Sequence, residues 1–229
     1  MFLLILLQIF AIAYGKDDSS VPVKLNRLTS GHGDPNVSFQ VQTLEPQEKV
    51  KFQFYYETLC PYSITAYVYQ LKDTVMELAP YLDITTYPYG NARMKLNGTQ
   101  MTINCQHAED ECYGNMLHAC AIDALKDATK YIPYNSCMMK YSMDMKSNDE
   151  AADECGEELN VDSKSIKECA NGIKGFELLL YYGIESGKVK YKGVPWWFVN
   201  GVSKTRGERK PLKKILCAAF KNPPEACSK

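Results

Sequence analysis

The odd number of cysteines is the feature that most constrains how this chain can fold. Nine cysteines occur in 229 residues. In an oxidising compartment most cysteines close into disulfide bonds, so eight of the nine can form four bridges. The ninth must stay single, pair with another molecule or be chemically reactive. Identifying that cysteine is therefore the central question that the sequence poses.

The first fifteen residues indicate passage through such a compartment. They are apolar and uncharged until Lys16, and they are fewer than the roughly 20 residues that a membrane-spanning helix needs. Ala13 and Gly15 occupy the small-residue positions of a cleavage site before Lys16. We expect a signal peptide at residues 1–15, with a buried helix as the alternative. We expect no membrane anchor later in the chain and therefore secretion, with the lysosome or endosome lumen as the alternative.

Two further observations concern modification and partners. Asn36 and Asn97 each begin an Asn-x-Ser/Thr sequon, which predicts a glycoprotein. The chain carries 26 Lys and Arg residues against 27 Asp and Glu residues, so it has no surplus of positive charge to neutralise phosphates. We therefore expect no nucleic-acid partner, and no residue pattern indicates a cofactor.

The composition changes along the chain. Residues 16–48 are rich in Ser, Asp, Pro, Gly and Gln, which predicts a flexible or loosely docked N-terminal extension. From residue 49 apolar and polar residues alternate, as in a half-buried strand that ends near Tyr56. A helix that begins at Pro61 and a second strand at about 82–86 complete a βαβ unit. The apolar positions that predict these elements are Val50, Phe52, Phe54, Ile64, Val68, Leu71, Val75, Leu78, Leu82 and Ile84.

The second half of the chain is organised differently. Residues at about 92–170 hold six of the nine cysteines, together with helix-forming residues, acidic runs and little strand signal. This composition predicts a helical insertion linked by disulfides. A helix around 176–180, a hairpin with its turn at 200–201 and a last helix at 212–220 are expected to follow. The predicted order is therefore β-α-β, helical insertion, α, β-hairpin, α within one domain at 49–229.

The pattern indicates that Cys60 is the reactive cysteine, because it lies between the end of the first strand and the start of the helix. A sulfur at a helix N-terminus faces unpaired N–H groups and the positive end of the helix dipole, which stabilise a thiolate. With Pro195 expected to be cis and to face the thiol, this arrangement resembles the thioredoxin fold. In that fold a second cysteine resolves the mixed disulfide, but here Ser63 occupies the resolving position. The alternative is that Cys60 is a small buried apolar residue or half of a bridge.

A second motif lies between the strand region and the last helices. Its members are Cys105, Gln106, His107, Glu111, Cys112, Asn115 and Cys120. They match seven of the eight fixed positions in a signature that this segment resembles, that of the gamma-interferon-inducible lysosomal thiol reductase family. The exception is Ala108, where the family has glycine. The resemblance continues in shorter stretches at 55–60, 88–92, 168–170 and 194–196.

The resemblance implies an α/β architecture, a thioredoxin-like fold with a disulfide-rich helical insertion. Members of the family are luminal enzymes that reduce protein disulfides at acid pH. A family pattern with ten cysteines would lose one of them at Ser63, which leaves Cys60 single. The eight cysteines then expected in bridges are Cys105, Cys112, Cys120, Cys137, Cys155, Cys169, Cys217 and Cys227.

The signature also allows a metal interpretation. Cysteine, histidine and glutamate this close together can indicate a metal site, but the Cys-x6-Cys-x7-Cys spacing fits no zinc pattern. We therefore expect bridges and no metal. His107 and His118 are expected to be structural rather than catalytic bases, and Glu109, Asp110 and Glu111 are expected to form a solvated face.

The serine at position 63 leaves three functional interpretations. In the first, the chain is a secreted homologue with weak or no dithiol reductase activity, and it acts by binding a protein through a surface that includes Trp196 or Trp197. In the second, Cys60 exchanges disulfides of protein substrates as a single thiol, with glutathione or another small thiol completing the cycle. In the third, Cys60 forms a lasting disulfide with a partner or with a second copy of the chain.

Overall fold

The chain consists of two units, which are described separately. The computed structural model describes residues 23–28, 38–43, 48–205 and 211–228. The boundary between the units falls between Glu48 and Lys49. The expected signal peptide and the Asn36 sequon lie outside the described residues.

The first unit contains a two-stranded antiparallel sheet. Strand β1 (Val23–Leu28) pairs with β2 (Ser38–Thr43) along their whole length. The sequence analysis predicted a flexible or loosely docked extension here and did not predict these strands. The Gly- and Pro-containing segment that separates them in the sequence contributed to that interpretation.

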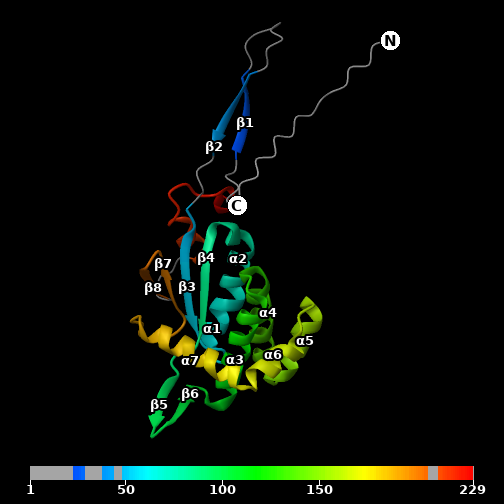
Figure 1. The fold of residues 1–229 in the computed structure, drawn as a ribbon, viewed down its shortest axis with the longest axis vertical. Helices are drawn as coiled ribbons and strands as arrows, with labels where there is room; N and C mark the ends of the chain where they lie inside the picture. Colours follow the sequence, from blue (N-terminus) through cyan, green and yellow to red (C-terminus); the bar gives the residue numbers. More distant parts are fainter. Residues whose placement is uncertain (1–22, 29–37, 44–47, 206–210, 229) are drawn as a thin grey trace, which may run out of the picture. The chain divides into compact units, whose positions relative to one another are not determined.

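The second unit is built on a four-stranded sheet with the order β4-β3-β7-β8 (Figure 1). Strand β3 (Val50–Tyr56) pairs in parallel with β4 (Leu82–Pro88). On its other side β3 pairs antiparallel with β7 (Trp196–Val199), and β7 forms a hairpin with β8 (Val202–Thr205). The turn of this hairpin lies at 200–201, as predicted. A central strand therefore ends beside both the Cys60 helix and the last hairpin.

The connection between β3 and β4 is helical throughout. Helix α1 (Pro61–Ala66) continues through a π-helical turn, η1 (Tyr67–Leu71), into α2 (Lys72–Leu78) and the short 3₁₀ turn η2 (Ala79–Tyr81). The five apolar residues predicted to face inward from this connection are all buried: Ile64, Val68, Leu71, Val75 and Leu78. The predicted βαβ unit is thus present, with a π-helical turn that the apolar spacing did not reveal.

Aromatic side chains fill the core between the sheet and this connection. The ring of Phe54 on β3 stacks on Trp197 at 5.9 Å between centroids and meets the edge of Tyr67 at 5.8 Å. Phe54, Trp197 and Tyr67 are all buried. Such ring pairs add to the free energy gained by burial itself, so they fix β3 and β7 against the helix that follows Cys60.

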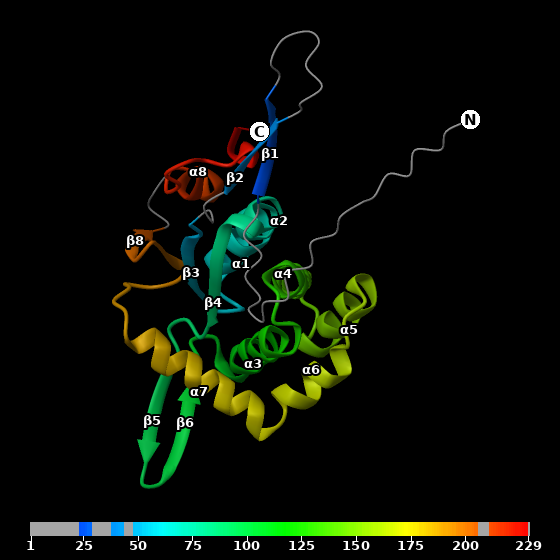
Figure 2. The same cartoon turned by 45° about the horizontal axis from the view of Figure 1, so that its top comes forward.

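A helical region with its own apolar core follows β4 in the chain (Figure 2). It consists of α3 (Ala108–Leu125), α4 (Ala128–Met143), α5 (Asn148–Leu159), α6 (Ser163–Ala170) and α7 (Ile173–Gly187). Among the described residues, no helix is both long and apolar enough to cross a membrane. The last helix of the chain, α8 (Leu212–Cys217), ends before Phe220, where the sequence analysis placed its end.

The expected helical insertion also contains a strand pair that was not predicted. Strands β5 (Arg93–Asn97) and β6 (Gln100–Asn104) form a hairpin that projects away from the four-stranded sheet (Figures 1 and 2). All side chains of β5 are exposed, so the segment lacks the alternation by which a half-buried strand is recognised. Asn97 and Gly98 are a hairpin dipeptide as well as part of a sequon, and Gly98 has the positive φ of +63° that such turns require.

Candidate active site at Cys60

Cys60 is the N-cap residue of α1, at the junction with β3. Its backbone is extended, and its carbonyl oxygen accepts a hydrogen bond from the Ile64 amide at 3.0 Å. Pro61 takes the first helical position, where no amide hydrogen is needed for helix bonding. The Cys60 residue retains 7% of its accessible surface. The thiol therefore lies at the start of the helix and just beneath the protein surface.

The thiol faces the peptide that precedes the last hairpin. The bond between Val194 and Pro195 is cis, and the Cys60 Sγ atom lies 3.8 Å from the Val194 carbonyl oxygen. Of the two tryptophans that follow, Trp197 is buried, whereas Trp196 is partly exposed and donates from Nε1 to the Ser203 hydroxyl at 2.9 Å. Trp196 is thus the tryptophan that a partner can contact.

Ser63 lies three residues after Cys60 and is fully buried. The amide of Glu57 approaches its hydroxyl oxygen at 3.5 Å, a long hydrogen bond. All nine cysteines lie within the described residues, and Cys60 is the only one that is not in a disulfide. The site therefore offers one thiol and no second thiol that could resolve a mixed disulfide.

The other cysteines form four bridges. The sequence left their pairing open, and the structure pairs Cys105 with Cys112, Cys120 with Cys169, Cys137 with Cys155 and Cys217 with Cys227. Three of these bridges lie between residues 105 and 169, in the helical region and the segment just before α3. The first of them closes a short loop that contains three further signature residues, Gln106, His107 and Glu111.

Signature residues on α3 hold the loop that presents Cys60. The Thr58 amide donates to Asn115 Oδ1 at 3.0 Å, and the Thr58 hydroxyl donates to the Glu111 carbonyl oxygen at 3.4 Å. At Gly114 a Cβ atom would lie 2.6 Å from the Thr58 hydroxyl, so only glycine allows this approach. Asn115 is fully buried, and it supplies the acceptor that the buried Thr58 amide needs. The signature thus connects the helical region to the active-site loop.

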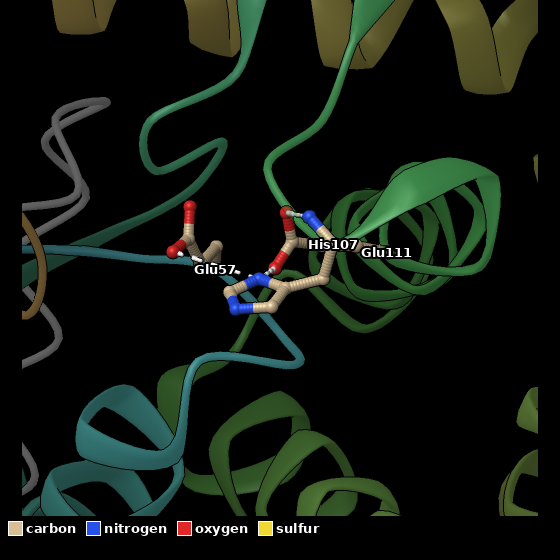
Figure 3. A group of neighbouring side chains, drawn as sticks. All are labelled: Glu57, His107 and Glu111. Atoms are coloured by element: carbon tan, nitrogen blue, oxygen red, sulfur yellow. Dashed lines mark hydrogen bonds and ion pairs between the residues drawn. The ribbon is translucent and has the colours of Figure 1, made fainter.

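Three ionisable side chains meet beside this loop (Figure 3). His107 Nδ1 lies 2.5 Å from Glu111 Oε2 and 4.0 Å from Glu57 Oε1. Asn91 donates to the Glu57 carboxylate from its amide at 2.8 Å and from its side chain at 3.2 Å. Burial raises the pKa of Glu57, and the hydrogen bond from the Asn91 amide acts against that shift. Glu57 and Glu111 are both fully buried.

The expectation that residues 109–111 form a solvated face is wrong for Glu111. Glu109 and Asp110 are exposed, but the helical turn carries Glu111 inward to His107. Sequence reasoning also missed Glu57 and Asn91, which are remote from the signature in the chain. The stretches of family resemblance at 55–60 and 88–92 contain both residues and are the signal that could have indicated them.

The one departure from the signature, Ala108, has an unfavourable backbone conformation. Ala108 has a φ of +67°, in the left-handed region that glycine adopts without strain. The family has glycine at this position, so the substitution places a side chain in a backbone conformation that disfavours it. The segment keeps this conformation nonetheless, because the Cys105–Cys112 bridge and the bond from the His107 amide to Glu111 Oε1 hold it on both sides.

His118 is buried in the core beneath the site rather than exposed to substrate. Its Nδ1 atom lies 3.0 Å from the Tyr56 hydroxyl, and burial raises the pKa of Tyr56 well above its usual value. The hydroxyl therefore keeps its proton and donates a hydrogen bond to the ring nitrogen. Burial also lowers the pKa of His118 to about 3, so the folded protein holds this histidine neutral. A structural role was expected for His118, and its position is that of a core residue.

We expect acid to destabilise the protein through His118. The folded state keeps the ring neutral down to a pKa of about 3, whereas the unfolded chain protonates it near pH 6.5. The contribution of the neutral His118 ring to the free energy of unfolding is therefore fully present above about pH 6.5. It decreases as the pH falls toward 3, and at about pH 4.5 roughly 3 kcal/mol has been lost. Urea unfolding at about pH 7.5 and about pH 4.5 should show that His118→Gln loses less stability on acidification than the wild type does. Equal losses in the two proteins would contradict the assignment.

Comparison with known proteins identifies the family. Residues 51–159 match the family model described as gamma interferon inducible lysosomal thiol reductase (GILT). A gamma-interferon-inducible lysosomal thiol reductase from Carassius auratus is 33% identical over 186 residues, which cover 78% of this chain and 72% of that protein. The chain belongs to the GILT family. A GILT-like protein from Anopheles gambiae is 31% identical over 69% of this chain and 70% of its own length. The mouse enzyme is 28% identical over 81% and 74% of the two chains.

The fold agrees with this membership. A putative protein-disulfide isomerase from Pseudomonas syringae superposes with a TM-score of 0.52 at 8% identity, covering 76% of this chain and 94% of that one. The predicted α/β, thioredoxin-like fold with a disulfide-rich helical insertion is confirmed. As a GILT family member, the chain belongs among the thiol-disulfide oxidoreductases.

Proposed function

We propose that this GILT family member is a secreted protein that binds a disulfide-containing protein partner at Cys60 and has weak or no dithiol reductase activity. The observation that carries the proposal is the single thiol of the site. Ser63 is buried at the resolving position, and the eight other cysteines are bridged. The secreted location rests on the signal peptide expected at residues 1–15.

The chemistry of a single thiol explains why a partner should stay attached to Cys60 instead of being reduced and released. The Cys60 thiolate attacks one sulfur of a partner disulfide, which forms a Cys60–partner disulfide and releases the second partner sulfur as a thiolate. In a dithiol enzyme the resolving cysteine then displaces the bound sulfur. The Ser63 hydroxyl is a poor nucleophile toward sulfur, so the mixed disulfide persists until an external thiol displaces it.

A second candidate function is one-thiol disulfide exchange. The Cys60 position at the start of α1 favours it, because the sulfur lies beside the unpaired amide groups of a helix N-terminus. A small thiol such as glutathione would then attack the partner sulfur that is bound to Cys60, forming a disulfide with that sulfur and releasing Cys60 as a thiolate. The same chemistry directed at a second copy of the chain would give a disulfide-linked dimer.

Insulin reduction with a small-thiol donor tests the proposal, at about pH 4.5 and about pH 7. We expect the wild type to be little faster than Cys60→Ser in this assay. In a parallel incubation with insulin but without the thiol donor, we expect a trapped wild-type complex on non-reducing gels that Cys60→Ser lacks. Wild-type activity that disappears in Cys60→Ser would instead support one-thiol exchange. Failure of the wild type both to reduce and to trap a disulfide substrate would contradict both candidates.

A further inference from the structure

The cluster beside the active-site loop has the features of a metal site. We propose that Glu57, His107 and Glu111 bind a divalent transition-metal cation, with Zn²⁺ the best match. One ligand atom from each residue lies within 4.8 Å of the others. Figure 3 shows Glu57 from the loop before Cys60 beside His107 and Glu111 from the start of α3.

The charge of the cluster favours a cation. Buried carboxylates are costly unless they are paired or coordinate a metal ion. Glu57 and Glu111 are fully buried, and within the described parts of the chain the ion pairs of both involve a single basic side chain, His107. One imidazole cannot neutralise two carboxylates, and a neutral imidazole neutralises neither. A divalent cation held by the two carboxylates and the neutral ring would balance the charge.

The donor set and its geometry suit zinc. One imidazole nitrogen with two carboxylate oxygens matches the ligand types that Zn²⁺ accepts, and three protein ligands leave a fourth position open. Ligand atoms around a tetrahedral Zn²⁺ lie about 3.3 Å apart, given bonds of roughly 2.0–2.2 Å. The present separations from His107 Nδ1 are 2.5 Å and 4.0 Å, so each would change by less than about 1 Å, and the two carboxylate oxygens, which lie within 4.8 Å of each other, would approach by up to about 1.5 Å. His107 is 34% exposed, which gives an ion a path to the cluster.

Neighbouring groups hold the ligands in place, as outer-shell partners do in metal sites. Asn91 donates two hydrogen bonds to Glu57, and the His107 amide donates to Glu111 Oε1 at 3.1 Å. The Cys105–Cys112 bridge closes the loop that carries His107 and Glu111. The sequence analysis rejected a metal because it considered the cysteine spacing of the signature alone. Glu57 lies outside that segment and was not considered.

Such an ion would join two parts of the fold. Glu57 belongs to the loop that precedes Cys60, whereas His107 and Glu111 belong to the helical region. A bound Zn²⁺ would therefore fasten the active-site loop to α3 and stabilise the folded protein. This role does not depend on whether Cys60 turns over substrate.

Metal binding can be tested on the full chain with its four disulfides intact and with Cys60→Ser as background, so that the free thiol cannot act as a ligand. After treatment with a chelator, titration calorimetry with Zn²⁺ should show one ion per chain and a rise in the melting temperature. Co²⁺ bound in place of Zn²⁺ should give the visible absorption bands that are typical of a four-coordinate site. Glu111→Gln and His107→Gln should weaken Zn²⁺ binding at least about tenfold.

The control is Glu109→Gln, which removes an exposed carboxylate from the same acidic run. It should bind Zn²⁺ as the parent does. Because His107 lies partly at the surface, His107→Gln keeps the test decisive even if Glu111→Gln folds poorly. Absence of stoichiometric binding, or equal binding by the Glu109→Gln and His107→Gln proteins, would overturn the proposal.

Discussion

Replacing Ser63 with cysteine is expected to convert the chain into a dithiol reductase. The new thiol would lie three residues after Cys60, in the resolving position, and could displace the bound partner sulfur within the same molecule. We expect the rate of insulin reduction to rise at least about tenfold and the trapped complex to decrease in parallel. The site accepts the change because, among the residues that the structure describes, the Ser63 hydroxyl makes one long hydrogen bond, which it accepts from the Glu57 amide at 3.5 Å.

Ser63→Ala is the matched control for this experiment. It removes the hydroxyl from the same buried position without adding a thiol, so any effect of repacking appears in both variants. The reaction should be followed together with a titration of free thiols, which must show two per chain in Ser63→Cys. A Ser63→Cys protein that is folded and has both thiols free, but is no more active than Ser63→Ala, would contradict the prediction. It would show that the surroundings of Cys60, rather than the missing thiol, limit the reduction of disulfides.

Removal of the Cys120–Cys169 bridge is expected to cause the largest loss of stability of any single disulfide. This bridge spans a sequence separation of 49 residues, the longest of the four. In the chain-entropy model, closing such a loop lowers the entropy of the unfolded chain and thereby stabilises the folded protein by about 4 kcal/mol. The Cys120 side chain also lies in the apolar core of the helical region, so its loss removes packing as well.

The double variant Cys120→Ala with Cys169→Ala should be compared with Cys217→Ala with Cys227→Ala. The second bridge spans only 10 residues and should contribute about 3 kcal/mol by the same argument. Urea unfolding of both proteins measures the difference. A larger loss from the C-terminal pair would mean that the order of stabilities is set by something other than loop length and core packing.

Sequence reasoning succeeded where burial imposes a repeating pattern. Val50, Phe52 and Phe54 alternate with polar residues because one face of β3 packs on the core, and all three are buried as predicted. The inward positions of the helix after Cys60 follow for the same reason. The hairpin β5–β6 was missed because the side chains of β5 are exposed, and a strand without a buried face has no periodic signal.

The site was predictable only in part, for a related reason. Cys60 and Ser63 are neighbours along one helix, so their spacing in the sequence reports their spacing in the molecule. Glu57 and His107 are brought together by packing of the β3 loop on α3, which no local pattern encodes. Glu111 appeared to belong to a charged surface, because its neighbours in the chain are exposed while its own helical position faces inward.

The shielding of Cys60 has a practical consequence for anyone who purifies this protein. A lone thiol in the presence of four disulfides can catalyse bridge scrambling, and its low exposure of 7% limits this reaction in the native protein. Denaturing the sample for electrophoresis removes that protection. Alkylation of the thiol before denaturation is therefore essential, since otherwise chains that were never linked in solution will exchange bridges and appear on the gel as covalent oligomers.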